Sequence, residues 1–171
     1  AATVLSAGLA APASALEQGF SSFIVLGDSL SDDGNLYELT SGAFPASPPY
    51  YQGRFSDGPV WSDMIAAEFD AAGKPTRNFA YGGARATSSA SFIPALEQQL
   101  LFLGGEIATD FDPGDRPLTT IWLGANDAFS ARTAGDPEDI GRTAADDVIG
   151  GVLQLAGLGF MDFILPNLPT L

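Results

Sequence analysis

Residues 23–30 read FIVLGDSL, and this stretch indicates the fold. The apolar run Phe23–Leu26 is closed by Gly27, a pattern typical of a short strand buried on both faces of a parallel sheet. A polar turn then carries Ser29 immediately beyond the strand. Because ligands of open parallel sheets bind outside the carboxyl ends of the strands, this turn is a candidate functional site.

Three further short segments are predicted to form strands of the same sheet, with three amphipathic stretches forming helices between them. The strands are expected at Arg77–Ala80, Leu118–Leu123 and Phe160–Leu165, and the helices over 60–69, 93–103 and 138–155. Strands that alternate with helices favour right-handed crossovers and a parallel sheet. The Ser-, Gly-, Pro- and Tyr-rich residues 41–59 are predicted to form a long surface loop.

The same patterns predict three local details. Trp61, Met64 and Phe69 recur at helical spacing and are expected to pack into the core. Gly104-Gly105 is expected to end the second helix, because glycine is a poor helix former. The run at 160–165 is expected to be a buried strand.

Composition narrows the class of protein. The chain has 171 residues, of which 46% are hydrophobic, so it is long and apolar enough for one folded domain, expected over residues 16–171. Its 7 basic and 21 acidic side chains give a formal charge of −14, which disfavours nucleic acids and anionic lipid surfaces as partners. It contains no Cys and no His, which excludes disulfides, zinc sites, thiol nucleophiles and imidazole bases within these residues. The sequence contains no uninterrupted run of 18 apolar residues, so no membrane-spanning helix is predicted.

The first 15 residues resemble the end of a signal peptide. They form a short apolar run that closes on Ala13-Ser14-Ala15, a small-x-small pattern of the kind that signal peptidase cleaves. We therefore expect residues 1–15 to be a signal-peptide remnant and the protein to be exported. An Ala-rich tail or a first helix is the alternative interpretation.

Each of the first three predicted strands is followed by a turn with chemically useful groups. Ser29 follows the first strand, Gly83 the second and Asn126 the third. Because the carboxyl ends of parallel strands meet at one edge, these residues are expected to converge. A serine hydroxyl would be the nucleophile, and the N–H groups of Ser29 and Gly83 with the Asn126 amide would hold a developing oxyanion. If instead the residues merely turn the chain and cap helices, they carry no chemistry.

These turns resemble the conserved blocks of the GDSL lipases/esterases, also called SGNH hydrolases. Residues 27–30 (GDSL), 78–84 (NFAYGGA) and 124–127 (GAND) match the first three blocks, and the resemblance covers roughly residues 22–169. It implies a flavodoxin-like α/β/α sandwich with parallel strand order 2-1-3-4-5. It also implies hydrolysis of carboxylic esters without a metal or organic cofactor, with Ser29 as nucleophile and Gly83 and Asn126 in the oxyanion hole.

One block of that family is missing. The family's Asp-x-x-His block supplies the base, and this chain contains no histidine. We expect that the chain is part of a longer enzyme, whose fifth strand and Asp-x-x-His block lie beyond Leu171, and that these 171 residues alone are inactive. The alternative is a protein that has lost catalysis and binds its ligand in the same cleft.

The resemblance leaves the substrate open among lipid esters, short acyl esters and acetylated carbohydrates. Two rival functions stay open with it. One is a non-catalytic module of the same fold that binds carbohydrate or lipid. The other is an acyltransferase that passes the acyl group to an alcohol rather than to water.

Overall fold

A computed structural model describes residues 19–131 and 136–168 of the chain. Four strands form one sheet in the order β2-β1-β3-β4, and every pairing is parallel. Their bounds are Ser22–Gly27 for β1, Thr76–Asn78 for β2, Pro117–Trp122 for β3 and Asp162–Ile164 for β4. The predicted order is confirmed for these four strands, and the described residues contain no fifth. The signal-peptide interpretation of residues 1–15 lies outside the described residues.

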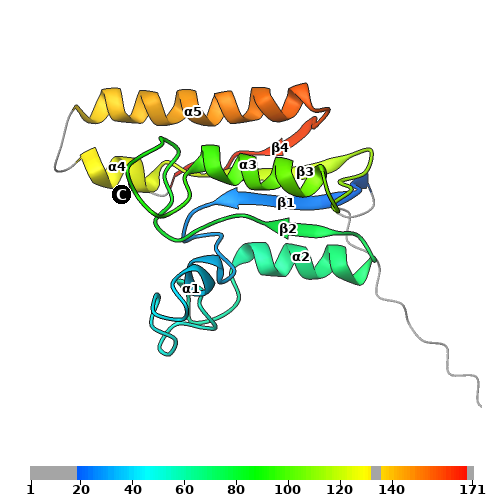
Figure 1. Ribbon diagram of the computed structural model, residues 1–171, viewed down its shortest axis with the longest axis horizontal. Helices are drawn as coiled ribbons and strands as arrows, with labels where there is room; N and C mark the ends of the chain where they lie inside the picture. Colours follow the sequence, from blue (N-terminus) through cyan, green and yellow to red (C-terminus); the bar gives the residue numbers. More distant parts are fainter. Residues whose placement is uncertain (1–18, 132–135, 169–171) are drawn as a thin grey trace, which may run out of the picture.

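Helices cover both faces of the sheet. Figure 1 shows α2 (Trp61–Ala71) on one side, and α3 (Leu96–Ile107) with α5 (Pro137–Gly157) on the other. Two short helices, α1 (Asn35–Leu39) and α4 (Ala125–Ala131), are the next elements along the chain after β1 and β3. The expected three-layer α/β/α arrangement is therefore present. No helix within residues 19–131 and 136–168 is long and apolar enough to cross a membrane.

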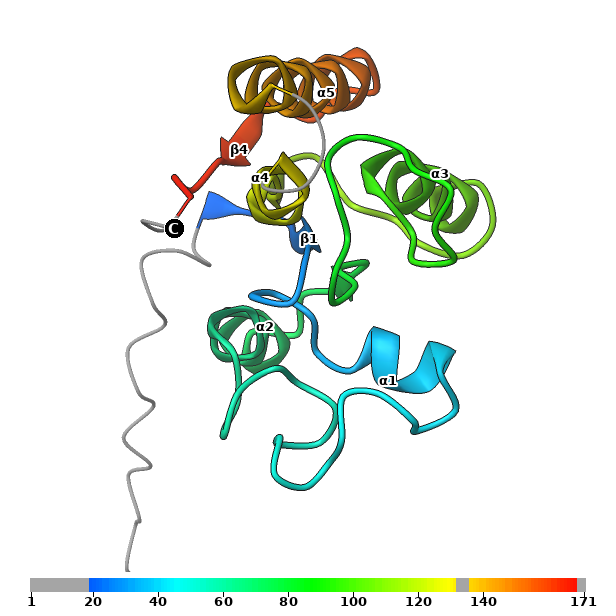
Figure 2. The same cartoon turned by 90° about the vertical axis from the view of Figure 1, so that its left-hand side faces the viewer.

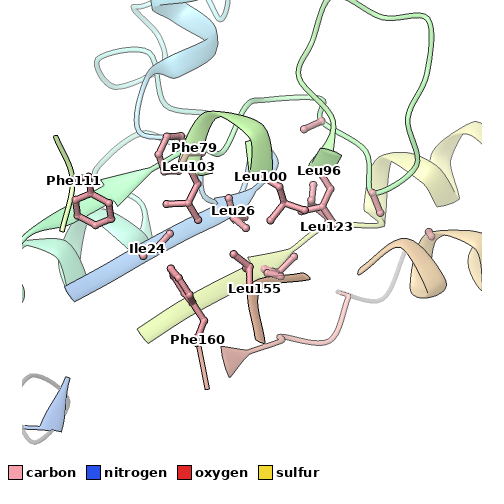
Figure 3. Close-up of a cluster of buried hydrophobic side chains, with 14 residues drawn as sticks. Ile24, Leu26, Phe79, Leu96, Leu100, Leu103, Phe111, Leu123, Leu155 and Phe160 are labelled. Carbon is pink, nitrogen blue, oxygen red and sulfur yellow. The ribbon is translucent and has the colours of Figure 1, made fainter. Parts of the chain in front are cut away.

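Alternate residues of β1 pack into two cores, one on each face of the sheet. Ile24 and Leu26 contact the larger cluster beneath α3 and α5, shown in Figure 3. Phe23 belongs to the smaller cluster beneath α2, where its ring stacks on Phe69 with centroids 5.4 Å apart. Full burial of such a side chain contributes roughly 1.5–3 kcal/mol, so β1 is fixed from both sides. The prediction that it is buried on both faces is confirmed.

The three local details are each wrong, at least in part. Met64 is 66% exposed, whereas Phe69 is fully buried and Trp61 packs, partly buried, against the cluster beneath α2. Helix α3 continues through Gly104 and Gly105 to Ile107, because a glycine costs a helix only about 1 kcal/mol and the apolar face of α3 packs on the larger cluster. The last strand is limited to Asp162–Ile164 and is only half buried, because β4 pairs with a single neighbour in the described chain.

Candidate active site

The turns that follow β1, β2 and β3 meet at the carboxyl edge of the sheet. Ser29, Gly83 and Asn126, one from each turn, line a single cavity of about 360 Å³. The structure thus brings together all three residues that the sequence singled out, although their catalytic roles remain a prediction. The other seven lining residues, all apolar or glycine except the threonine, are Leu36, Thr40, Phe44, Phe55, Gly82, Phe92 and Ile93. A serine, a glycine and an asparagine therefore line a cavity whose other walls are mostly apolar.

The cavity wall offers hydrogen-bond donors that the described chain leaves unused. The backbone N–H groups of Ser29 and Gly83 donate to no other described residue. Asn126 Nδ2 donates one bond, to the Ala84 carbonyl at 2.8 Å, and its second N–H has no such partner. Gly83 has φ +79°, and a Cβ there would lie 3.0 Å from Ile93 Cδ1, so its position favours glycine twice over. This set of donors is suited to a negatively charged oxygen.

Asp32 ties the first turn to the second. Its side chain is fully buried, and its carboxylate accepts hydrogen bonds from the N–H groups of Gly34, Asn35 and Gly82, at 2.8, 2.7 and 2.7 Å. Burial raises the pKa of Asp32, and these backbone bonds oppose the rise. Because Gly82 precedes Gly83 in the chain, Asp32 sets the position of the second turn relative to Ser29.

Two asparagines reinforce this connection. Asn35 Nδ2 donates to the carbonyls of Asn78 and Ala80, each at 3.0 Å. Asn78 Nδ2 donates in turn to the Ser31 carbonyl at 2.8 Å, while Asn78 Oδ1 accepts from Ala80 N at 2.9 Å. Carboxamides can donate and accept together, so this pair satisfies backbone groups from both turns.

Asp127 holds the chain that follows Gly83. Its buried carboxylate accepts hydrogen bonds from Ala86 N at 2.9 Å and from Thr87 N at 3.1 Å. The third turn therefore anchors the second turn through Asp127, just as the first turn does through Asp32.

Gln99 fixes the end of β1 from the side of α3. Its Oε1 accepts from Gly27 N and its Nε2 donates to Gly27 O, both at 2.9 Å, and the side chain is fully buried. This two-way bond satisfies the backbone of β1 two residues before Ser29.

Asp28, next to Ser29 in the chain, carries a perturbed carboxyl group. Burial raises the pKa of Asp28 to about 6; a hydrogen bond from Leu30 N opposes the rise and the charge of Asp127 adds to it. In the described ranges no three carboxylates gather in a way that would hold a metal ion.

Sequence reasoning missed the positioning roles of Asp32, Asn35, Gln99 and Asp127. Three of them stand inside or a few residues beyond the turns that the motifs marked, but the bonds by which Asp32 and Asp127 reach the second turn span 40 to 50 residues of the chain. Gln99 had a clearer signal, because it is a polar residue on the apolar face of a predicted helix.

The strand order, the flanking helices and the cavity at the carboxyl edge define an α/β fold of the SGNH hydrolase type. The family described as "GDSL-like Lipase/Acylhydrolase" matches residues 23–171, and the chain belongs to that family.

Several curated proteins are similar to this chain. A phosphatidylcholine-sterol acyltransferase of Aeromonas hydrophila is 37% identical over 161 residues, which cover 89% of this chain and 45% of that protein. A thermolabile hemolysin of Vibrio parahaemolyticus is 30% identical over 148 residues, covering 85% of this chain and 33% of the relative. An acetylesterase of Thermothelomyces thermophilus is 26% identical over 181 aligned residues, which cover 96% of this chain and 59% of that protein. The chain thus spans between a third and three fifths of the length of these relatives.

Proposed function

We propose that this chain carries the nucleophile and the oxyanion hole of an exported serine ester hydrolase. The observation that carries the proposal is the shared cavity, which Ser29, Gly83 and Asn126 all line. Family membership and relatives named as an acyltransferase and an esterase support ester chemistry. Export rests on the resemblance of residues 1–15 to the end of a signal peptide.

In the proposed mechanism, Ser29 Oγ attacks the acyl carbon of the ester and loses its proton to a general base. The carbonyl oxygen becomes an oxyanion, which accepts hydrogen bonds from the N–H groups of Ser29 and Gly83 and from Asn126 Nδ2. Collapse of this intermediate expels the alcohol, which takes up the proton, and leaves an acyl group on Ser29. Water, activated by the same base, then releases the acid and restores the serine.

The histidine that serves as general base in this family has no counterpart in this sequence, which contains no histidine. We propose that a base from outside these 171 residues activates Ser29, and that the chain alone turns over esters very slowly. Loss of the corresponding base in a serine protease lowers turnover by roughly a million-fold.

The lining of the cavity favours an apolar acyl group. Leu36, Phe44, Phe55, Phe92 and Ile93 surround the space beside Ser29, and no charged side chain is among the residues that line it. A hydrocarbon chain can be buried there without leaving a polar group unpaired. We therefore propose acyl esters with an apolar acid part, such as lipid esters or short acyl esters, in preference to acetylated carbohydrates.

Covalent labelling tests the proposal. The full protein, including any sequence that continues beyond this chain, is treated with a fluorophosphonate probe and digested for mass spectrometry. We expect the adduct on Ser29, its loss in Ser29→Ala and its retention in Ser31→Ala. Ser31 is a matched control because its buried hydroxyl has no hydrogen-bond partner among the described residues. Undiminished labelling of Ser29→Ala, or no labelling at all, would refute the assignment of Ser29.

Acyl transfer is the second candidate function. A relative that is 37% identical is named as a phosphatidylcholine-sterol acyltransferase, which favours an alcohol as acceptor. Product analysis with and without an added alcohol distinguishes the two reactions, because transfer yields a new ester and hydrolysis yields a free acid. A non-catalytic binding module would bind the ester but form neither product.

A further inference from the structure

Two segments that flank the cavity contain no charged side chain. They are residues 39–53 and 86–96, here called the rim loops, in a chain that has 7 basic and 21 acidic residues. The first contributes Thr40 and Phe44 to the cavity lining, and the second contributes Phe92 and Ile93. Both rim loops lie at the end of the molecule that is at the left of Figure 1 and faces the viewer in Figure 2. The rim loops thus bring no charged side chain of their own to the mouth of the cavity.

The rim loops also expose large apolar side chains. Phe44 is 55% exposed and Phe92 is 72% exposed, although both line the cavity, and Leu39 nearby is 47% exposed. Isolated exposed apolar residues are ordinary on protein surfaces, whereas a group of them around a pocket marks an interaction site.

The first rim loop is held in this conformation by internal contacts. Thr40 Oγ1 accepts a hydrogen bond from Phe44 N at 3.0 Å, and the Phe44 ring packs edge-on against Phe55 at 5.6 Å between centroids. Phe55 itself lies against Gly82, where a Cβ would come within 2.1 Å of its ring. The exposure of Phe44 is therefore a property of a packed loop.

We infer that the rim loops dock on the surface of an uncharged or zwitterionic lipid layer, with Phe44 and Phe92 at the interface. The inference rests on the proposed function, because docking there lets an acyl chain pass from the lipid into the cavity beside Ser29. Two observations select this partner. The net charge of −14 on these 171 residues opposes anionic lipids, and the side chains of the rim loops carry no charge, so they lose no ionic hydration when they meet a layer without net charge. Aromatic side chains are well suited to the boundary between headgroups and acyl chains.

Vesicle flotation measures this docking without any chemistry. The full protein is mixed with phosphatidylcholine vesicles, and in parallel with vesicles rich in phosphatidylserine. We expect the protein to bind phosphatidylcholine vesicles and to bind phosphatidylserine-rich vesicles more weakly. The variants Phe92→Ser and Leu39→Ser are each expected to lose roughly three- to tenfold in affinity for phosphatidylcholine vesicles. Met161→Ser is the matched control: Met161 is 75% exposed but precedes β4, at the opposite edge of the sheet, and its replacement is expected to leave binding unchanged.

The outcomes separate this inference from the proposed function. Leu39 does not line the cavity, so Leu39→Ser is expected to hydrolyse a dissolved short ester at the wild-type rate. Hydrolysis of that ester without any binding to phosphatidylcholine vesicles overturns the inference and leaves the proposed function standing; a rim covered by another segment of the full protein gives this result. Stronger binding to phosphatidylserine, or an equal loss in Met161→Ser, also overturns it. If flotation depends on the rim loops but the fluorophosphonate probe never labels Ser29, the docking inference stands and the proposed hydrolase function is refuted.

Discussion

Replacing Gly82 with alanine is expected to destabilise the protein, because a methyl group has no room there. An added Cβ would lie 2.1 Å from Phe55 Cε2 and 2.5 Å from Cζ, far inside van der Waals contact. The ring cannot withdraw freely, since it packs against Phe44 and Tyr50 with centroids 5.6 and 5.8 Å away. The backbone cannot shift freely either, because Gly82 N donates to the buried Asp32 carboxylate at 2.7 Å.

Overpacking of this kind costs about 1–3 kcal/mol, and at about 2–4 °C per kcal/mol the midpoint of thermal unfolding should fall by several degrees. The backbone angle at Gly82 is one that alanine adopts, so the cost is steric. Gly104 provides a matched control within α3. A Cβ there would meet nothing within 4 Å, and Gly104→Ala is expected to stabilise the protein by about 0.5–1 kcal/mol.

Thermal unfolding and urea unfolding, both followed by circular dichroism, measure the midpoint and the free energy of unfolding of both variants. A double-mutant cycle isolates the contact: Gly82→Ala should cost less when Phe55 is already alanine, because the clashing ring is gone. Equal stability of Gly82→Ala and the wild type, or the same loss in both backgrounds, would refute the packing of Phe55 on Gly82.

Two buried carboxylates give further predictions. Asp127→Ala leaves the N–H groups of Ala86 and Thr87 without acceptors and should lower ester turnover by the full protein roughly tenfold or more. Asp57→Ala, at an exposed position, is the control and should leave turnover unchanged. Equal turnover by Asp127→Ala and the wild type would contradict the role given to Asp127. Asp28 has a folded pKa of about 6, above the ordinary 3.8, so the folded state binds its proton more tightly and stability falls as pH rises from about 4 to about 6. Asp28→Asn should therefore be more stable than the wild type by roughly 2–3 kcal/mol at pH 7, with no such gain near pH 3 in urea unfolding; a gain that is independent of pH would contradict this.

The central strands β1 and β3 were predictable from the sequence, because burial on both faces leaves a continuous apolar run that is easy to recognise. The order of the strands was implied by the resemblance to the GDSL family and is confirmed for the four described strands. Phe23–Leu26 lies within β1, and the turn carrying Ser29 is at the carboxyl edge where the parallel arrangement requires it. The short helices α1 and α4 were not predicted. Each has fewer than eight residues, too few to show a helical period.

The framework of the candidate site was not predicted, for a different reason. Asp32 bonds to Gly82 and Asp127 to Ala86, and the periodicity of a sequence carries no information about such distant pairs. The extent of α3 was missed because propensity is a weak guide: Gly104 is tolerated where the rest of the helix packs well.

The dependence of Gly83 on its two neighbouring turns limits how the site can be re-engineered. Asp32 accepts a hydrogen bond from the residue just before Gly83, and Asp127 accepts one from Ala86, three residues beyond it. Grafting the GDSL turn onto another parallel sheet would therefore transfer a serine without the geometry that surrounds it. A functional graft would have to include all three turns together with the carboxylates of Asp32 and Asp127, because each turn is positioned by hydrogen bonds to another.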